Sequence, residues 1–222
     1  MPRVEKITSN IYIAGGDNSA TEDAAVYLIT DGTDSALIDS GTGRGTDMII
    51  QNIKNTGIDP ASIKLIFLTH CHYDHTGGAS ALREITSAKT VMHKLDASYV
   101  RDGDAETTAA SWYGSIMPET PVDIMIKSDS EIFRIGELEI TAWHTPGHSP
   151  GSIVLTMMSD GMKILFGQDV HGPIHPALKS DKEKYKHSLE FMMTLNADIL
   201  CEGHYGVIRG KDHVRDFIKS FL

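Results

Sequence analysis

The sequence predicts an α+β fold in which two β-sheets pack face to face, with helices on their outer sides. Short β-rich runs bounded by Gly, Asn or Asp turns fill two separate parts of the chain. Segments with helical periodicity follow the strands in each part. The chain has 222 residues, of which 41% are hydrophobic, and this is enough for one domain with a sizeable core.

Local patterns place the individual elements. In the first part, the spacing of Ile49, Ile50 and Ile53 predicts a helix that ends near Gly57. Strands are expected there at residues 10–14, 24–30, 35–39, 64–68 and 90–93, and a second helix at 78–86. In the second part, strands are expected at 131–135, 138–143, 152–157 and 163–166, and helices at 182–195 and 213–221.

Residues 94–130 lack a clear period and separate the two parts. Trp112, Tyr113 and Met117 lie in this stretch, with prolines at 118 and 121. We expect a helical excursion, and the pattern fits a cap over a functional site and a plain surface connection equally well. The three large side chains would form either an apolar wall for a substrate or a contact in a homodimer.

Charge and composition narrow the class of partner. The formal net charge of −10 argues against a nucleic-acid backbone, which requires clustered Lys and Arg. The chain opens without an apolar leader, and no run approaches the roughly 20 apolar residues of a membrane span. Two cysteines, Cys71 and Cys201, provide no disulfide framework. We therefore expect a cytoplasmic protein that acts on a small-molecule substrate.

Potential metal ligands are concentrated directly after the apolar run 64–68, where residues 70–75 read His-Cys-His-Tyr-Asp-His. Alternate side chains of a strand point to one side, so His70 and His72 are expected to aim at one point. Asp74 and His75 would face a neighbouring point. Imidazoles and a carboxylate this close together need partners when they are buried, and metal ions supply them.

Three later polar residues each follow an apolar, β-like run, where functional sites are usually built. His148 lies in a Pro/Gly loop between two expected strands, Asp169 follows the strand at 163–166, and His204 follows a further apolar run. Each alone would be an ordinary strand-end residue. In this order after the first motif, they predict one metal centre.

This ordered set of motifs resembles the metallo-β-lactamase superfamily. The motifs are Thr-His-x-His-x-Asp-His-x-Gly-Gly at 69–78, Thr-Pro-Gly-His at 145–148, Gly-x-Asp at 167–169 and Gly-His at 203–204, preceded by Leu-Ile-Asp-Ser-Gly at 37–41. The resemblance extends over most of the chain. It implies a four-layer αββα sandwich, with two mixed β-sheets flanked by helices and a metal site at one edge of the sheets.

The resemblance also implies roles for individual residues. The implied ligands are His70, His72 and His148 for one metal ion, Asp74, His75 and His204 for a second, and Asp169 as a bridge between the two. Asp39 would order the histidine loop without binding metal. These nitrogen and oxygen ligands suit two Zn²⁺ ions and also permit Fe or Mn. Cys71 would point away as a packed thiol.

Two adjacent metal ions would share a water molecule, lower its pKa toward neutrality and present the resulting hydroxide to an electrophilic carbon or phosphorus. Asp74 is expected to orient that hydroxide and pass its proton on. His171 is the candidate proton donor or substrate contact, because it lies two residues beyond Asp169. A weaker candidate is His175. The side chains expected at the surface or in packing are His93, His144, His187 and His213. Tyr73 and Tyr205 are expected to pack, with contact to the substrate as the alternative.

The fold class does not determine the reaction, because the superfamily includes thioesterases, lactonases, β-lactamases, phosphodiesterases, nucleases and oxygen-using iron enzymes. The motifs are most similar to those of glyoxalase II-like hydrolases, so a small ester, thioester or lactone is the first expectation. Glutathione thioesters fit less well, because the basic helical domain that binds glutathione in glyoxalase II has no counterpart after His204. Two alternatives stay open: a phosphodiesterase, and a mononuclear iron enzyme that resembles persulfide dioxygenases and shares their cysteine at position 71.

Other members of the superfamily fit less well. The short spacing from Asp169 to His204 disfavours nucleases with an inserted domain, and His72 disfavours flavin-dependent di-iron enzymes, which usually carry Glu there. Secreted β-lactamases usually lack the bridging aspartate. A non-catalytic metal-binding regulatory protein is disfavoured because no ligand is missing. Metal stoichiometry separates the main options: one iron favours the dioxygenase, and two metal ions favour hydrolysis.

Overall fold

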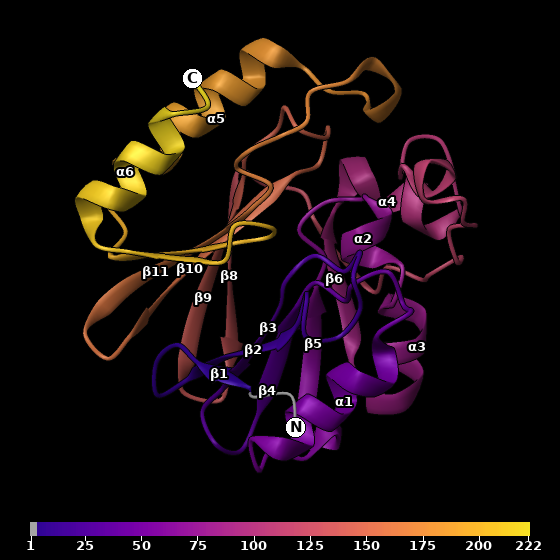
Figure 1. Cartoon of the computed structure of the whole chain (residues 1–222), viewed down its shortest axis with the longest axis vertical. Helices are drawn as coiled ribbons and strands as arrows, with labels where there is room; N and C mark the ends of the chain where they lie inside the picture. Colours follow the sequence, from indigo (N-terminus) through magenta and orange to yellow (C-terminus); the bar gives the residue numbers. More distant parts are fainter. Residues whose placement is uncertain (1–3) are drawn as a thin grey trace.

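Two sheets form the centre of the molecule in a computed structural model that describes residues 4–222 (Figure 1). Within these residues, the first sheet runs in the order β1-β2-β3-β4-β5-β6-β7 and the second in the order β13-β12-β11-β10-β9-β8. The strands of the first sheet are Glu5–Lys6 (β1), Ile11–Gly15 (β2), Val26–Thr30 (β3), Ser35–Ile38 (β4), Ile63–Phe67 (β5), Lys89–His93 (β6) and Ile124–Ile126 (β7). Those of the second are Ser130–Ile135 (β8), Leu138–His144 (β9), Ile153–Ser159 (β10), Met162–Gln168 (β11), Ile199–Glu202 (β12) and Val207–Arg209 (β13).

Helices cover the outer face of each sheet (Figure 1). The first sheet is covered by α1 (Thr46–Asn55), α3 (Ala79–Thr86) and α4 (Lys94–Arg101), and the second by α5 (Lys182–Thr194) and α6 (Lys211–Lys219). The expected α+β, four-layer αββα sandwich is therefore confirmed. No helix in the described part of the chain is both long and apolar enough to cross a bilayer. Residues 1–3, which begin the stretch expected to lack a leader, lie outside that part.

Three apolar layers hold the sandwich together, and β3 shows how one strand serves two of them. Side chains alternate along a strand, so Tyr27 and Ile29 pack between the two sheets while Val26 and Leu28 pack under the helices. Tyr27 meets Phe166 of the second sheet edge to face, with ring centroids 5.5 Å apart. A third cluster joins β10, β11 and β12 to α5 and α6. Strands buried on both faces read as continuous apolar runs, which is why the sequence predicts them well.

The sheet topology brings several loops to one edge. β4, β5 and β6 are parallel, with Ile38 opposite Phe67 and Phe67 opposite Val91, so their carboxyl ends lie side by side. In the second sheet, β11 and β12 are also parallel, with Phe166 opposite Cys201. β9 and β11 are both antiparallel to β10, so β9 also ends at this edge. The loops that follow all these strands can therefore meet.

Part of the segment 94–130 belongs to the fold itself. It begins with α4, contains the 3₁₀ turn Ala110–Tyr113, and ends with β7, which adds a parallel strand beside β6. Met117 is buried in the layer beneath the helices, whereas the side chain of Trp112 is exposed. The expectation that all three side chains form one surface, either a substrate wall or a dimer contact, is therefore wrong, because Met117 packs inward. A cap over the site stays a prediction for the remainder.

Candidate metal centre

The segment 68–76 carries four of the expected ligands, but not on a strand. β5 ends at Phe67, and the chain leaves the sheet before His70 and His72. The expectation that strand alternation aligns these two histidines is wrong. A loop followed by one helical turn, α2 (Tyr73–Thr76), brings them together instead, and their rings meet edge to face with centroids 4.5 Å apart.

Asp39 holds the start of this loop. Its carboxylate accepts hydrogen bonds from the backbone N–H and the hydroxyl of Thr69, both at 2.8 Å. The same carboxylate accepts from His75 Nδ1 at 2.6 Å and from the side-chain amide of Gln168. Asp39 therefore joins the histidine loop of the first sheet to the end of β11 in the second.

The structure brings all seven expected ligands together in two adjoining groups. Within each group, one candidate ligand atom per residue lies within 4.8 Å of every other; the groups are His70, His72, His148 and Asp169, and Asp74, His75 and His204. Six of the seven residues are buried, whereas His204 is partly exposed. The chain thus collects nitrogen and oxygen donors from four separate loops at one place.

Asp169 lies between the two groups and faces both. Its Oδ2 is 3.1 Å from His148 Nε2 and 3.7 Å from His70 Nε2. Its Oδ1 is 2.9 Å from His75 Nε2 and 3.3 Å from His204 Nε2. One carboxylate therefore offers a separate oxygen to each group.

Hydrogen bonds on the far side of the rings fix which nitrogen faces the centre. His75 Nδ1 is bound to Asp39, and His148 Nδ1 is 2.9 Å from the carbonyl oxygen of Pro173. In both rings Nε2 is left for the centre, as is usual for metal-binding histidines. Among the described residues, His72 Nε2, His75 Nε2 and Asp169 Oδ1 are buried polar atoms without a hydrogen-bond partner. Such atoms are costly unless something binds them, and divalent cations fit this donor set.

Neighbouring imidazoles keep the carboxylates of Asp169 and Asp74 ionised. Burial raises the pKa of Asp169, but His75 and its other imidazole neighbours outweigh burial and hold this pKa well below its usual range. In the same way, burial lowers the pKa of His204, while hydrogen bonds to Asp169 and Asp74 raise it to about 10. Burial lowers the pKa of His72 to about 3, so this ring is neutral at pH 7. The ionised carboxylates of the centre therefore lie beside cationic imidazoles, because the same interactions also raise the pKa of His75, and His72 offers a free lone pair.

A comparison with known protein families decides the family of this chain. The family model described as the metallo-β-lactamase superfamily matches residues 21–204. The chain belongs to the metallo-β-lactamase superfamily.

Several known proteins are similar to this superfamily member in sequence or in structure. A probable metallo-hydrolase of Methanocaldococcus jannaschii is 31% identical over 57% of the chain and 59% of its own length. A probable metallo-hydrolase of Bacillus subtilis is 33% identical over 58% of the chain and 57% of its own length. The matched segment thus spans less than two thirds of either relative. A subclass B3 metallo-β-lactamase of Bradyrhizobium japonicum has a similar structure, with a TM-score of 0.80 and 25% identity over 98% of this chain and 90% of that one.

Glu202 also supports the site, although no sequence motif pointed to it. Its side chain is fully buried, and Oε1 is 2.8 Å from Nδ1 of His171. Oε2 accepts from the backbone N–H groups of His204 and Tyr205, at 2.7 and 2.9 Å. Glu202 therefore orients the His171 ring and the His204 loop together. An acidic residue at the end of an apolar run, directly before Gly-His, was the available signal.

The other expected side chains divide between packing and surface. The Cys71 thiol is buried and points toward the carbonyl of Thr107, 3.9 Å away, rather than toward the centre. Tyr73 is buried and packs on Tyr113. Tyr205 also packs, on the rings of His171 and Phe217, although 61% of its surface is exposed. His175 caps the short helix at Ala177, and His187 and His213 are exposed.

His93 and His144 stack face to face, with centroids 3.8 Å apart, and this pair leads to a prediction about pH. Burial and the nearby His144 lower the pKa of His93 to about 4. In the unfolded chain His93 binds a proton below about pH 6.5. Between these two pKa values the unfolded chain binds a proton that the folded chain does not. The free energy of unfolding therefore has its full value above pH 6.5 and decreases as the pH falls toward 4.

We expect the free energy of unfolding to fall between pH 7 and pH 5 by about 1–2 kcal/mol more in the native protein than in His93→Asn. Asparagine can still accept the hydrogen bond that His93 takes from the N–H of Leu95 at the start of α4. Urea unfolding of both metal-free proteins at the two pH values measures the difference. Equal losses in the two proteins would contradict the assignment.

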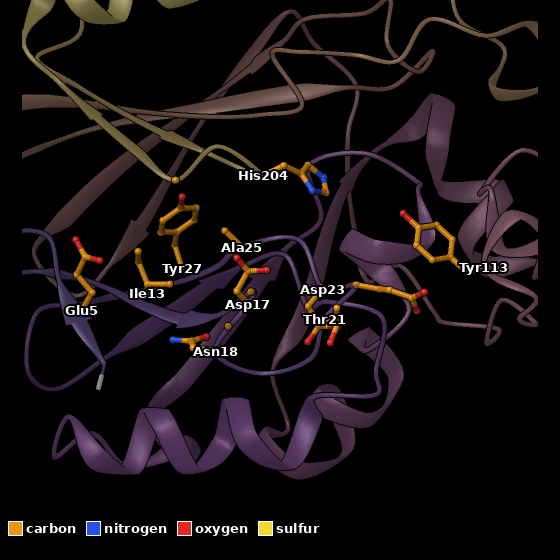
Figure 2. Close-up of a pocket in the computed structure, with 15 residues that line it drawn as sticks. Glu5, Ile13, Asp17, Asn18, Thr21, Asp23, Ala25, Tyr27, Tyr113 and His204 are labelled. Atoms are coloured by element: carbon orange, nitrogen blue, oxygen red, sulfur yellow. The ribbon is translucent and has the colours of Figure 1, made fainter. Parts of the chain in front are cut away.

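A cavity of about 570 Å³ opens beside His204 (Figure 2). Tyr113 and His204 border it at one end, while Glu5 and Ile13 lie at the other. This volume suits a small molecule. Since His204 belongs to the second group of ligands, the cavity adjoins the centre.

Proposed function

We propose that this chain is a hydrolase that binds two divalent metal ions, with Zn²⁺ as the best fit, and cleaves a small ester, thioester or lactone. The observation that carries the proposal is the position of Asp169, whose two oxygens face two complete groups of donors. Bound divalent ions would supply Lewis acidity toward the substrate oxygen and activate water at neutral pH.

The chain's own residues would hold and move the protons. Asp74 Oδ2 lies 3.2 Å from His204 Nε2 and, as an ionised carboxylate, can accept a proton at the centre. Glu202 accepts a hydrogen bond from Nδ1 of His171, so Nε2 of that ring can take up a proton at the centre and, as an imidazolium, pass it to the departing group. His171 shares a group with Asp169 and His204, whose candidate ligand atoms lie within 4.8 Å of one another, so it is close enough for this role.

The charges around the cavity favour neutral or cationic substrates. Four acidic residues and no Lys or Arg line it, all within the described residues. Glu22 is paired with Arg44, whereas Asp23 keeps its charge and accepts hydrogen bonds from the neutral hydroxyls of Ser19 and Thr42. Asp17 and Glu5 are exposed. This arrangement repels phosphodiesters and glutathione conjugates and supports an uncharged or cationic ester.

Neutralising Asp17 tests this charge preference. We expect Asp17→Asn to shift the ratio of kcat/KM for a cationic ester over a matched anionic ester toward the anionic one, by about 3- to 10-fold at low salt. Asp47→Asn changes the net charge equally on the exposed side of α1, and it should leave the ratio unchanged. Identical shifts in both variants would mean that the cavity does not select by charge.

Metal analysis combined with a substrate panel tests the proposed function. The panel contains thioesters, lactones, simple esters and phosphodiesters, assayed with the protein as purified and after removal and return of Zn²⁺. Two metal ions per chain and metal-dependent cleavage of an ester-type substrate support the proposal. One iron per chain with oxygen uptake would support the persulfide dioxygenase-like alternative instead. Two ions with no turnover across the panel would favour the regulatory protein.

A further inference from the structure

Asp96 is a fully buried carboxylate outside the group of ligands. It lies in the first turn of α4, at the start of the segment 94–130. Its Oδ2 accepts a hydrogen bond from the backbone N–H of Cys71 at 3.0 Å and another from the hydroxyl of Ser149. Its Oδ1 accepts from the backbone N–H of Gly151 at 2.6 Å. No lysine, arginine or histidine pairs with it among the described residues.

The donors to Asp96 come from both histidine-bearing loops of the first group. Cys71 lies between His70 and His72 in the loop that follows β5. Ser149 and Gly151 follow His148 in the loop between β9 and β10. One carboxylate therefore binds the backbone between His70 and His72 and the Ser149 hydroxyl next to His148, although it contacts none of the three rings.

The loop after His148 is shaped to approach Asp96 closely. A Cβ atom added at Gly151 would lie 2.7 Å from the backbone nitrogen of Asp96 and 2.8 Å from its Cβ. Ser152 Oγ lies 2.8 Å from Ser149 Oγ and accepts from the Ser149 N–H, so the hydroxyl that donates to Asp96 is held in place. The two loops also meet directly, through the hydrogen bond from Ile153 N to Thr69 O at 2.8 Å.

We propose that Asp96 is the positioning residue for the first metal ion, and that it sets the distance between the His70–His72 pair and His148. This inference rests on the proposed function, because it assigns a role toward a metal ion. Asp39 provides the comparable support for the second group through His75. Two buried carboxylates thus bind the histidine loop at different residues, Asp39 at Thr69 and His75 and Asp96 at Cys71.

Loss of the Asp96 carboxylate should lower the affinity for the first metal ion more than the affinity for the second. Removing a residue that orients metal ligands typically costs about 10- to 100-fold in metal affinity. We expect Asp96→Asn to weaken binding of the first ion by this factor while binding of the second ion changes less than about threefold. Asparagine preserves the shape of the side chain, but its NH₂ group is a donor where a second acceptor oxygen is required.

The test measures site-resolved affinity with Co²⁺ and Zn²⁺ as the only ligands. Titration with Co²⁺ follows the two binding steps by their visible absorption bands, and competition with a chelator gives the two Zn²⁺ dissociation constants. The matched control is Asp123→Asn, which removes a carboxylate that accepts from Arg83 and the N–H of Thr90, in a different part of the fold. Asp123→Asn should bind both ions like the native protein.

Hydrogen exchange in the metal-free protein gives a second readout. The amides of Cys71 and Gly151 donate to Asp96, so their exchange should accelerate at least about 10-fold in Asp96→Asn, while amides in the strand core exchange as in the native protein. Exchange rates and metal binding together distinguish failure of the proposed function from failure of the role of Asp96. A native protein that binds no metal would end the proposed function, whereas unchanged exchange at both amides would overturn the role of Asp96.

Two further variants, Ser149→Ala and Asp96→Glu, test the role of Asp96 by smaller changes. If Asp96→Asn does not fold, Ser149→Ala removes one of the three donors and should weaken the first ion alone by a smaller factor. Asp96→Glu restores the carboxylate and should recover part of the affinity. Equal weakening of both ions in Asp96→Asn and in Ser149→Ala would show a general effect on the fold and would overturn the proposal.

Discussion

Asp169→Ala is expected to lose both metal ions together and to lower kcat/KM at least about 1,000-fold, equivalent to about 4 kcal/mol of transition-state stabilisation. Its two oxygens face different groups, at 2.9 Å from His75 and 3.1 Å from His148. Without them, buried imidazoles face each other with no negative charge between them. Metal content by elemental analysis, measured beside kcat/KM on the best ester of the panel, checks both expectations.

Two further variants make this result specific. Asp169→Asn keeps the shape and one oxygen, so it should retain more metal than alanine but still fall well below the native protein. Asp198→Ala removes another aspartate, directly before β12, that accepts from the N–H of Lys163 away from the centre. It should keep both ions. Native metal content in Asp169→Ala would rule out a bridging role.

Asp39→Ala is the second large effect, and here the main expectation concerns stability. The side chain is fully buried and accepts from Thr69, His75 and Gln168. Alanine would leave these donors buried without a partner, and loss of one partner of a buried charged network costs about 3–5 kcal/mol. Asp39 also has a φ of +60°, a region that alanine tolerates less well than aspartate or asparagine.

The free energy of urea unfolding, measured with a chelator present, isolates this effect from metal binding. Asp39→Asn tolerates the same backbone conformation, so it should cost less than alanine by about 1 kcal/mol or more. A loss below about 1 kcal/mol in Asp39→Ala would mean that its hydrogen bonds contribute little to the fold.

The seven candidate ligands were predictable because each of the four segments that carry them follows a strong local signal. Apolar runs mark strands that are buried on both faces, and a histidine or aspartate directly after such a run stands at the edge of a sheet. Asp169 and His204 are of this kind, since both follow strands that are parallel in the second sheet. The ordered motifs then supply what periodicity alone cannot, namely which strand ends meet.

Other features depend on contacts that no local pattern encodes. The sequence places His70 on a strand, but the hydrogen bonds from Thr69 to Asp39 take the chain out of the sheet first. The edge strands β1 and β13 are too short for periodicity to reveal, and they exist through pairing with a neighbour. Asp96 reads as an ordinary acidic residue in the first turn of a helix until the loops that contact it are folded.

The division of the centre between two sheets has a consequence for the order of events in folding. Ligands of the first group come from both halves of the chain, so the first half holds His70 and His72 but lacks His148, and the second half holds the reverse. Chain entropy opposes bringing such distant residues together until the apolar faces of the two sheets have closed on each other. High affinity for metal is therefore a property of the finished sandwich, and metal binding and closure of the two halves form one coupled equilibrium.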